Sequence, residues 1–327
     1  MEQLSSEQLL VKVQEFIAKS DYAREPMGMY DPIKYVLDLG GKRLRPVLML
    51  LAYNLYREDV DSILWQATGI ETYHNFTLLH DDLMDKADMR RKKPTVHKKW
   101  NENTAILSGD AMLILSYRFM MEHCPDDKVQ AVMQVFGQTA LEVCEGQQWD
   151  MEFETRMDVT VNEYIEMIRL KTSVLLAAAL KIGAILGGAS ETDATRLYDF
   201  GIRMGLAFQL QDDYLDVYGD PAVFGKKIGG DILCNKKTYM LITALEKAEG
   251  ELKAELMKWI AATGYEPAKK IAAVTDIYNK VGIAGLCKER IEAYYQDGLH
   301  LLDAVDVEAS LKRNLHYFVF SLMNRNL

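Results

Sequence analysis

The segment LLHDDLMDKADMRRKKPTVH, residues 78–97, concentrates opposite charges in an otherwise apolar stretch. Asp81, Asp82, Asp85 and Asp88 fall in a helical pattern, and a run of cations follows them directly. On a helix Asp81 and Asp85 are four positions apart and Asp82 and Asp85 are three apart, so these carboxylates share one face, and Asp88 is expected to continue it. Neighbouring like charges destabilise a helix by about 0.2–0.5 kcal/mol per pair, so this stripe needs a counter-charge.

A solvated acidic face is the simplest explanation of one such stripe. The neighbouring Phe76, Leu79 and Leu83 indicate instead a helix that is buried on most sides. Carboxylates in such a place require neutralisation, and their hard oxygen atoms suit Mg²⁺.

The acidic arrangement occurs a second time in FQLQDDYLDVYGD, residues 208–220, again among apolar neighbours. Asp212 and Asp216 are four positions apart, and Asp213 and Asp216 are three apart. Two stripes on different helices can face each other across a helical core. Because Mg²⁺ completes its coordination with waters and substrate phosphates, the pair predicts a diphosphate held by metal ions. The candidate metal ligands are Asp81, Asp82, Asp85, Asp212, Asp213 and Asp216.

Basic residues beside the stripes would bind the phosphates of such a ligand. The segment GGKRLRP, residues 40–46, places Lys42, Arg43 and Arg45 beside two glycines, where backbone and side chains could both approach phosphate. Each basic cluster alone is typical of a solvated surface, and its position near the aspartates is what favours a binding role. The remaining candidates follow the two stripes: Arg90, Arg91, Lys227 and Lys236.

Composition limits the class of protein. The chain has 327 residues, of which 49% are hydrophobic, and a formal net charge of −10, so a general nucleic-acid or anionic-membrane surface is not expected. The four cysteines form no CxxC pair, and the N-terminal segment lacks the features of a signal peptide. The most apolar run, residues 174–188, is interrupted by Lys181. We expect a soluble cytoplasmic protein without stable membrane insertion and without a nucleic-acid partner.

Apolar residues recur at helical spacing along the chain, whereas proline and strand-like alternation are scarce. Gly187–Gly188 predicts the end of one helix. We expect roughly a dozen helices in an all-α bundle, which forms a single domain over residues 1–327. Residues 218–231, which contain glycine and proline, are expected to form a mobile loop. Three capping pairs predict helix starts: Ser5–Gln8, Thr160–Glu163 and Ser190–Asp193.

With these motifs assembled, the chain resembles the trans-isoprenyl diphosphate synthases, the family of farnesyl and geranylgeranyl diphosphate synthases. The matching segments occur in the family's order, from GGKRLRP through HNFTLLHDDLMD, DMRRKKPTVH, LSGDAML, EGQQWDM and KTSVL to FQLQDDYLD and GKKIGGDI. The resemblance implies an all-α fold around a central cavity, a homodimer, and three Mg²⁺ ions, with Mn²⁺ as an alternative ion. It also implies the condensation of isopentenyl diphosphate with dimethylallyl, geranyl or farnesyl diphosphate.

The resemblance also implies roles for individual residues. Asp81 and Asp85 resemble ligands of the first metal motif, with Asp82 beside them. Asp212 resembles the main ligand of the second motif, supported by Asp213 and Asp216. The residues that resemble the isopentenyl diphosphate pocket, which uses no metal, are Lys42, Arg45, His74 and Arg91. The residues that resemble the grip on the allylic diphosphate are Arg90, Lys171, Lys227 and Lys236. Thr172 and Gln209 resemble the oxygen-bearing groups that face the developing allylic cation.

In the implied reaction, metal ions and basic side chains stabilise the departing diphosphate, and the isopentenyl double bond attacks the allylic cation in a water-excluded pocket. A proton is then lost to the released diphosphate. The chain departs from the family pattern at two places. Lys92 stands where the family usually has glycine, and Cys234–Asn235 replace the usual acidic–glycine pair before lysine. Neither departure removes a candidate ligand.

Three other functions fit parts of this pattern. A farnesyl diphosphate synthase would share the motifs and differ in product length. A terpene cyclase would also carry an aspartate-rich helix, but usually with an Asn/Ser/Glu-type second motif and without a basic pocket for a second substrate. A silent regulatory subunit would be expected to have lost aspartates, whereas both sets are present here. Without the surrounding motif, His74 would be interpreted as a core histidine.

Product length is predicted from the helix that carries Asp81. Phe76 and Thr77 lie five and four positions before Asp81, close to one helical turn of about 5.4 Å. In the resembling family, bulky residues at these positions form the floor of the product cavity. One aromatic and one small residue, with no insertion in DDLMD, resemble the archaeal geranylgeranyl synthases, so a C20 product is favoured over C15. The alternative is that Phe76 is only a core residue.

Overall fold

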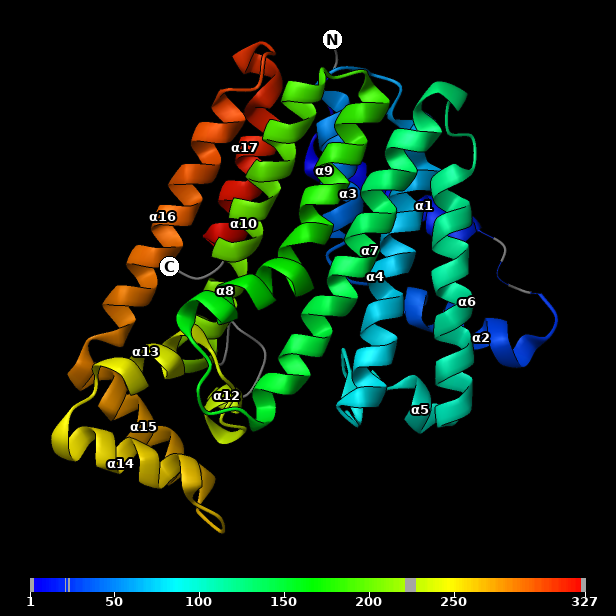
Figure 1. Ribbon diagram of the computed structural model, residues 1–327. Coiled ribbons are helices and arrows are strands. Elements are labelled where there is room, and N and C mark those ends of the chain that lie inside the picture. Colours follow the sequence, from blue (N-terminus) through cyan, green and yellow to red (C-terminus); the bar gives the residue numbers. More distant parts are fainter. Residues whose placement is uncertain (1–2, 21, 23, 221–227, 325–327) are drawn as a thin grey trace. The chain divides into compact units, whose positions relative to one another are not determined.

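The computed structural model describes residues 3–20, 22, 24–220 and 228–324. Helices dominate this part of the chain, whose only sheet is a two-stranded hairpin (Figure 1), so the prediction of an all-α fold is confirmed. Residues 221–227 of the predicted mobile loop, and with them the candidate Lys227, lie outside the described residues. The described elements are α1 (Ser6–Lys19), α2 (Met27–Asp38), α3 (Leu44–Asn54), η1 (Val60–Ile63), α4 (Leu64–Met84), β1 (Met89–Arg90), β2 (Lys93–Pro94), α5 (Val96–Lys99), α6 (Glu102–Met121), α7 (Asp126–Thr155), α8 (Val161–Ile168), η2 (Arg169–Ser173), α9 (Val174–Gly187), α10 (Glu191–Tyr218), α12 (Gly230–Leu233), α13 (Tyr239–Lys247), α14 (Gly250–Ala261), α15 (Pro267–Val281), α16 (Ile283–Asp303) and α17 (Ala309–Met323).

The chain divides into two compact units, each of which combines segments that are distant in the sequence. Four of the five boundaries between the units fall inside α7, α9, α10 and α17, and the fifth, between Ala304 and Val305, lies in the connection from α16 to α17. The prediction of a single domain over residues 1–327 stays a prediction. Unit 1 comprises Met1–Gly137, Ala178–Leu197 and Val305–Leu315, and unit 2 comprises Gln138–Ala177, Tyr198–Ala304 and His316–Leu327.

Unit 1 is built around α4, which packs along α6 (Figure 1). The two helices approach closely at Gly69 of α4, where a Cβ atom would lie 3.1 Å from the carbonyl oxygen of Ser116 on α6. Ile70 and Tyr73 of α4 are completely buried. Because apolar packing fixes α4 along most of its length, the side chains at its C-terminal end are held in place.

The predicted helix ends are present in both units. Ser5 before α1 and Thr160 before α8 each form a complete capping box. The hydroxyl of Ser190 accepts a hydrogen bond of 3.1 Å from the backbone N–H of Asp193 at the start of α10. α9 ends at Gly187, and Gly188 follows it with a φ of 91°. These contacts satisfy backbone groups that have no partner inside the helix.

In unit 2 the helical path changes to a π-helical turn at η2, between α8 and α9. Glycines allow two neighbouring helices to approach this turn. A Cβ atom on Gly146 of α7 would lie 2.3 Å from the backbone nitrogen of Lys171, and one on Gly205 of α10 would lie 2.6 Å from the Cα of Ser173. π-helical turns are rare and frequently occur at functional sites, so η2 marks a candidate site in unit 2.

The helical stretch Val161–Gly187 is long and apolar enough to cross a membrane, judged by length and composition alone. Inside the protein, however, 72% of its most apolar part is buried. The central helix of a folded domain has the same composition, so this stretch is interpreted as a core helix.

Candidate active site

The first acidic stripe lies at the C-terminal end of α4 in unit 1. Asp81 and Asp82 are in the last turn of the helix, and Asp85 is its C-cap. Carboxylates at this position add to the negative end of the helix dipole, which is unfavourable unless a cation neutralises them. The stripe is therefore a site of concentrated negative charge.

The helix ends before Asp88, contrary to the expectation that Asp88 continues the stripe. Lys86 adopts a left-handed φ of 53°, and the N–H of Ala87 donates to the carbonyl oxygen of Asp82 at 2.9 Å. This is the Schellman pattern of helix termination. Asp88 is exposed and pairs with Lys98 at 2.9 Å, and this hydrogen-bonded ion pair lowers the pKa of Asp88.

The three aspartates of the first stripe differ in burial. Asp82 is only 5% exposed, and its Oδ2 accepts a hydrogen bond of 2.7 Å from Arg90 Nε. Its Oδ1 is also buried and has no hydrogen-bond partner within the described part of the chain. Asp81 is half-buried and Asp85 is exposed, so these two carboxylates are more accessible to an incoming ion.

Arg90 and Arg91 lie on a β-hairpin that the sequence pattern did not predict. β1 and β2 pair antiparallel, and the two connecting residues, Arg91 and Lys92, have φ values of 51° and 63°. Two left-handed residues in a two-residue connection are typical of a type I′ turn. Glycine adopts this conformation without strain, which explains why the resembling family usually has glycine at the position of Lys92.

The segment GGKRLRP turns sharply into α3. Gly40, Gly41 and Arg43 have φ values of 76°, 134° and 48°, and α3 begins at Leu44. Within the described residues no side chain caps the first N–H groups of α3, and Arg45 lies in its first turn. A helix N-terminus with free N–H groups attracts anions, so backbone and side chains here favour the same kind of ligand.

Arg43 is buried, which differs from its predicted contact with phosphate. Its Nη1 donates to Glu71 Oε1 at 2.7 Å, and its Nη2 donates to the carbonyl oxygen of Leu37. Asn75 Nδ2 also donates to Glu71 Oε1, at 3.0 Å. Glu71, which the sequence analysis missed, is the counter-charge that permits the burial of Arg43. An isolated glutamate within the apolar run of α4, with Asn75 one turn later, was the available clue.

The arginines of unit 1 converge on His74. Burial lowers the pKa of His74 well below its ordinary value, and the charges of Arg45, Arg91, Arg90 and Arg43 lower it further. Burial likewise lowers the pKa of Arg45 to about 10, so that Arg45 remains charged at neutral pH. A neutral histidine among cations that disfavour one another's charge describes a pocket that an anion would stabilise.

The second acidic stripe lies near the C-terminal end of α10 in unit 2 and comprises Asp212, Asp213 and Asp216. Asp213 is 3% exposed and accepts hydrogen bonds from the Tyr164 hydroxyl and, at 3.1 Å, from Gln209 Nε2. Burial raises the pKa of Asp213 to about 7, against the lowering effect of the nearby Lys236. A bound cation would favour the ionised form of this carboxylate.

A chain of hydrogen bonds connects η2 to this stripe. The hydroxyl of Thr172 donates to Gln209 Oε1 at 3.4 Å, and Gln209 Nε2 donates to Asp213. The amide of Gln209 is thereby oriented with its oxygen toward Thr172. Lys171 pairs with Asp150 of α7 at 2.6 Å. Asp150 lies in the segment EGQQWDM, whose pattern did not indicate this pairing.

Asp216 accepts two hydrogen bonds from the backbone at the start of α12. Its carbonyl oxygen accepts from the N–H of Gly229 at 2.6 Å, and its Oδ2 accepts from the N–H of Asp231 at 3.0 Å. These bonds fix the start of α12 beside α10. They also occupy one carboxylate oxygen of Asp216.

The departure at Cys234–Asn235 has a structural explanation. Asn235 adopts a left-handed φ of 53°, a conformation that asparagine tolerates better than most residues with a side chain. Its Oδ1 accepts a hydrogen bond of 2.7 Å from Lys270, which is 1% exposed. Asparagine can therefore replace the glycine usual in the resembling family, and Lys270 holds it in place.

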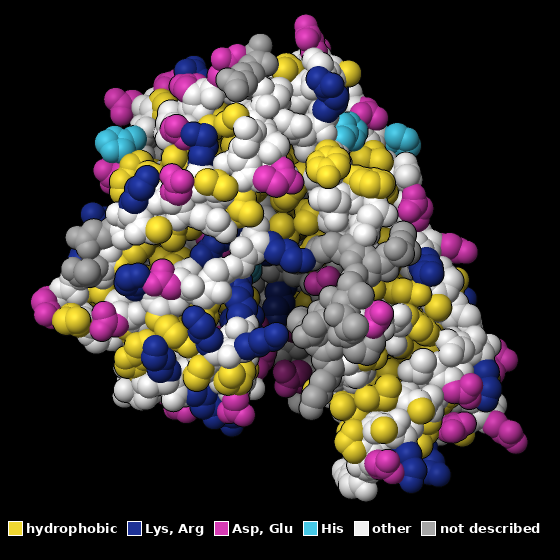
Figure 2. Space-filling model, turned by 180° about the vertical axis from the view of Figure 1, so that it is seen from behind, with side chains coloured by type: hydrophobic (Ala, Val, Ile, Leu, Met, Phe, Trp, Pro, Cys, Tyr) yellow, Lys and Arg dark blue, Asp and Glu magenta, His cyan; other side chains and the backbone are white. Residues whose placement is uncertain are grey.

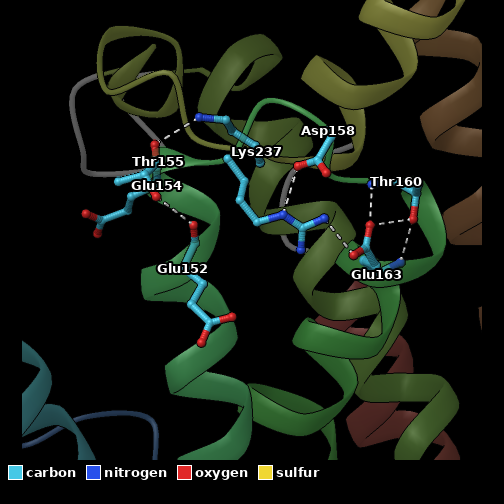
Figure 3. Close-up of polar contacts among 8 residues, drawn as sticks. Glu152, Glu154, Thr155, Asp158, Thr160, Glu163 and Lys237 are labelled. Carbon is cyan, nitrogen blue, oxygen red and sulfur yellow. Dashed lines mark hydrogen bonds and ion pairs between the residues drawn. The ribbon is translucent and has the colours of Figure 1, made fainter.

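Lys236 is followed by a buried lysine that anchors this segment. Lys237 Nζ donates to the carbonyl oxygen of Glu154 at the end of α7, at 3.1 Å (Figure 3). In the same region Arg156 bridges Asp158 and Glu163, each at 2.9 Å. The corner between α7 and α8 and the segment that carries Lys236 are thus fixed to each other.

The carboxylates fit Mg²⁺ only in combination with a substrate. Within the described ranges, no three His, Cys, Asp or Glu side chains form a group that could hold a metal ion. Mg²⁺ usually retains waters and takes one or two carboxylates together with substrate phosphates. The donor atoms are all hard carboxylate oxygens at the negative ends of helices, so the chemistry of the set fits an ion that is shared with a diphosphate.

Comparisons with known proteins agree with this chemistry. Residues 27–279 match the polyprenyl synthetase family. The chain is 40% identical to geranylgeranyl diphosphate synthase of Methanosarcina mazei over 282 residues, which cover 86% of this chain and 85% of that protein. It is 38% identical to a short chain isoprenyl diphosphate synthase of Methanocaldococcus jannaschii, covering 78% and 77% of the two chains. A crystal structure of a geranylgeranyl pyrophosphate synthase superposes with a TM-score of 0.94 at 45% identity, covering 99% of this chain and 100% of that one.

Proposed function

The chain belongs to the polyprenyl synthetase family, and from this premise we propose how its residues act in a short-chain prenyl diphosphate synthase that favours geranylgeranyl diphosphate. Members of this family are Mg²⁺-dependent prenyltransferases that use isopentenyl diphosphate and allylic diphosphates. The observation that carries the proposal is the cationic pocket around His74. A second diphosphate substrate requires a second cationic site, whereas a terpene cyclase requires only one.

Isopentenyl diphosphate is assigned to this pocket, with Lys42, Arg45, His74 and Arg91 as its ligands. Arg45 and Arg91 supply charge, and the N-terminal N–H groups of α3 add donors. His74 is neutral and contributes a hydrogen bond without titrating. Arg43 supports this pocket without binding the diphosphate, because its ion pair with Glu71 holds the turn before α3, which leads to Arg45.

The allylic diphosphate is assigned to the acidic stripes and the basic residues near them. Bound Mg²⁺, three ions per site with Mn²⁺ as an alternative, would neutralise the charge that develops on the departing diphosphate. Asp81, Asp85 and Asp212 are the foremost candidate ligands. The basic residues that would bind the same group are Arg90, Lys171, Lys227 and Lys236.

The allylic cation that forms when the carbon–oxygen bond breaks is assigned to Thr172 and Gln209. Their oxygen atoms lie 3.4 Å apart, and the Gln209 amide is oriented by Asp213. Neutral oxygen dipoles stabilise a cation without capturing it as a carboxylate would. The isopentenyl double bond then forms the new carbon–carbon bond, and the proton lost from the adduct goes to the released diphosphate.

The product length is assigned to Phe76 and Thr77 of α4. Phe76 is buried, and the centroid of its ring lies 4.9 Å from that of the His80 ring, in a T-shaped arrangement, and 5.5 Å from that of the Tyr73 ring. Because rings on both sides restrict the movement of the Phe76 side chain, it could form a rigid end to the cavity that holds the growing product. Thr77 is half-buried, and its hydroxyl donates to the carbonyl oxygen of His74 at 2.8 Å, which leaves a small group on the neighbouring face.

A homodimer is proposed from the exposed face of α6. Leu107, Ile114 and Met121 recur every seventh residue and are 57%, 63% and 46% exposed. The opposite face of α6 is buried against α4, so the helix carries apolar side chains on two faces, which is typical of a helix covered on both sides. Figure 2 shows the face opposite to that of Figure 1, where exposed hydrophobic side chains are interrupted by charged ones. A second copy of the chain would cover the α6 face, and sedimentation of Ile114→Glu would show whether the dimer depends on it.

A soluble cytoplasmic location is proposed as well. The substrates are water-soluble diphosphates, and the apolar stretch Val161–Gly187 is mostly used in the core.

One incubation tests the function. The purified protein is supplied with Mg²⁺, isopentenyl diphosphate and dimethylallyl, geranyl or farnesyl diphosphate, and the products are separated by chromatography. A C20 prenyl diphosphate is expected from each primer. A product that stops at C15 would indicate a farnesyl diphosphate synthase. Hydrocarbon formed without isopentenyl diphosphate would indicate a cyclase, and no product in any mixture would indicate a silent subunit.

A further inference from the structure

Lys270 of α15 is a buried charged residue that the proposed reaction does not use. It is 1% exposed, and its Nζ donates to Asn235 Oδ1 at 2.7 Å, to the carbonyl oxygen of Leu233 at 3.3 Å and to the Tyr265 hydroxyl at 3.4 Å. The Nζ also lies 4.4 Å from the centroid of the Tyr265 ring. Within the described residues no carboxylate pairs with Lys270, so neutral oxygens and one aromatic ring hold its ammonium group.

A buried ammonium group without a counter-ion is unfavourable, because neutral groups replace its hydration only in part. An apolar side chain of similar length would fill the same volume without this cost. The three N–H donors of Lys270 are all used, and a polar network that is fully satisfied makes the groups within it rigid. Two of the acceptors, Leu233 and Asn235, lie at the end of α12 and in the connection to α13. Lys270 therefore fixes this connection.

The path of the connection depends on the side chain of Asn235. This residue has a left-handed φ of 53°, and its amide joins two helices. Its Oδ1 accepts from Lys270 of α15, and its Nδ2 donates to the carbonyl oxygen of Ile260 of α14 at 3.0 Å. The next residue, Lys236, is exposed, and its backbone N–H donates to the carbonyl oxygen of Asp231 at 2.9 Å. Asn235 thus sets the direction in which the chain reaches Lys236.

α15 also holds the start of α12. Gly229, with a φ of 84°, directly precedes α12, and a Cβ atom there would lie 2.7 Å from Ile271 Cδ1. Adjacent residues of α15 therefore contact the two ends of α12, with Ile271 at its start and Lys270 at its end. A helix of four residues is too short to be stable by itself, so these contacts determine where α12 and the following turn lie.

The turn places Lys236 close to the second acidic stripe. The charge of Lys236 is near enough to lower the pKa of Asp213 on α10, against the larger raising effect of burial. On the other side of Lys236, the buried Lys237 is bonded to the end of α7. A long side chain loses conformational freedom when it binds phosphate, and a backbone that is already fixed reduces the total cost of ordering.

We propose that Lys270 is a positioning residue for the allylic diphosphate, because through the amide of Asn235 it fixes the turn that presents Lys236. The inference rests on the proposed function and deepens it, since it adds to the allylic site a residue that does not touch the substrate. Isopentenyl diphosphate is assigned to residues of unit 1, whereas Lys270 and Lys236 belong to unit 2. Loss of Lys270 should therefore affect the two substrates differently.

The test is Lys270→Met, with Lys269→Met as its matched control. Lys269 is exposed and pairs with Glu266 at 2.9 Å, so the control removes the neighbouring lysine without touching the turn. Initial rates in Mg²⁺ give the KM for farnesyl diphosphate and for isopentenyl diphosphate. Lys270→Met is expected to raise the first KM about tenfold, as loss of a hydrogen bond to a charged group does, and to leave the second within about twofold. Lys269→Met is expected to leave both within about twofold.

Two double-variant cycles test the route through Asn235 and Lys236. Lys270→Met should change the KM for farnesyl diphosphate by less than about twofold when Lys236→Ala or Asn235→Gly is already present. Asn235→Gly suits the left-handed turn and removes the same contact from its other side, so by itself it should raise this KM about fivefold. Urea denaturation identifies variants that do not fold. If Lys270→Met is one of them, Asn235→Gly takes its place in the cycle with Lys236→Ala.

The same measurements can overturn the proposal. An unchanged KM for farnesyl diphosphate, an equal rise in both KM values, a loss of kcat alone, or additive effects in either cycle would show that Lys270 only supports the fold. Absence of prenyl product from the wild-type chain would instead refute the proposed function on which the inference rests.

Discussion

The substitution Lys92→Gly should stabilise the protein, although it removes a whole side chain. Lys92 has a φ of 63° at the second position of the turn between β1 and β2. Relief of the left-handed conformation is worth about 1–2 kcal/mol. Glycine gains about 0.5–1 kcal/mol of freedom in the unfolded chain, which opposes this gain. The expected net effect is an increase of about 0.5–1 kcal/mol in the free energy of unfolding.

Lys93→Gly is the matched control, because it removes the same charge from the next residue. Lys93 belongs to β2, where no left-handed strain is relieved, so glycine should cost about 0.5–1 kcal/mol there. Urea denaturation at pH 7.5 would measure both variants, which should differ by about 1–2 kcal/mol. A loss of stability in Lys92→Gly as large as that in Lys93→Gly would refute the type I′ turn. The turn also implies that Lys92→Gly retains its turnover with isopentenyl and dimethylallyl diphosphates.

Further outcomes follow from the same structure. Asp81→Ala or Asp212→Ala should lower kcat by orders of magnitude with unchanged circular dichroism, and near-normal turnover in either variant would exclude its assignment to the metal. Arg45→Ala should raise the KM for isopentenyl diphosphate more than that for the allylic primer, because a charge-assisted contact contributes about 1.5–3 kcal/mol. A larger rise in the KM for the allylic primer would show that Arg45 belongs to the allylic site instead. The folded pKa of His74 lies below the ordinary 6.5, so its stabilising contribution is present above pH 6.5 and is lost as the pH falls toward the folded pKa. Stability should therefore decline less between pH 7.5 and 5.5 in His74→Gln than in the wild type, as urea denaturation at each pH would show. Phe76→Ala should lengthen the product by one or more C5 units, and Thr77→Phe should shorten it toward C15. Products of both variants that match those of the wild type in chromatography would reject the role of Phe76 and Thr77 in limiting product length.

The helices could be predicted from the sequence because their causes are local. Apolar spacing and capping pairs such as Ser5–Gln8 act within a few residues, and the structure contains them. Part of the cationic cluster around His74 could be anticipated because two of its arginines, Arg43 and Arg45, lie within one short segment. The individual role of Arg43 could not be predicted, because it depends on an ion pair with Glu71, which is 28 positions away in the sequence.

The features that the sequence did not reveal depend on contacts between distant segments. The strands of the hairpin have two residues each, too few for an alternating pattern. The π-helical turn depends on Gly146 and Gly205, which permit two helices to approach it from α7 and α10. The pairing of Lys171 with Asp150 joins residues 21 positions apart, and no periodicity predicts it.

The two acidic stripes share a division that their sequence spacing cannot show. In each stripe the second aspartate is the buried one, with Asp82 5% and Asp213 3% exposed. Each is held by side chains of its own unit, Asp82 by Arg90 and Asp213 by Tyr164 and Gln209. A helix places all three carboxylates of such a stripe on neighbouring faces, but burial separates them into accessible and enclosed groups. The enclosed aspartate accepts a hydrogen bond from a neighbouring side chain, Arg90 in one unit and Gln209 in the other, to which the proposed function gives a role toward substrate. The repeated motif therefore places one buried, hydrogen-bonded aspartate and two less buried aspartates in each unit.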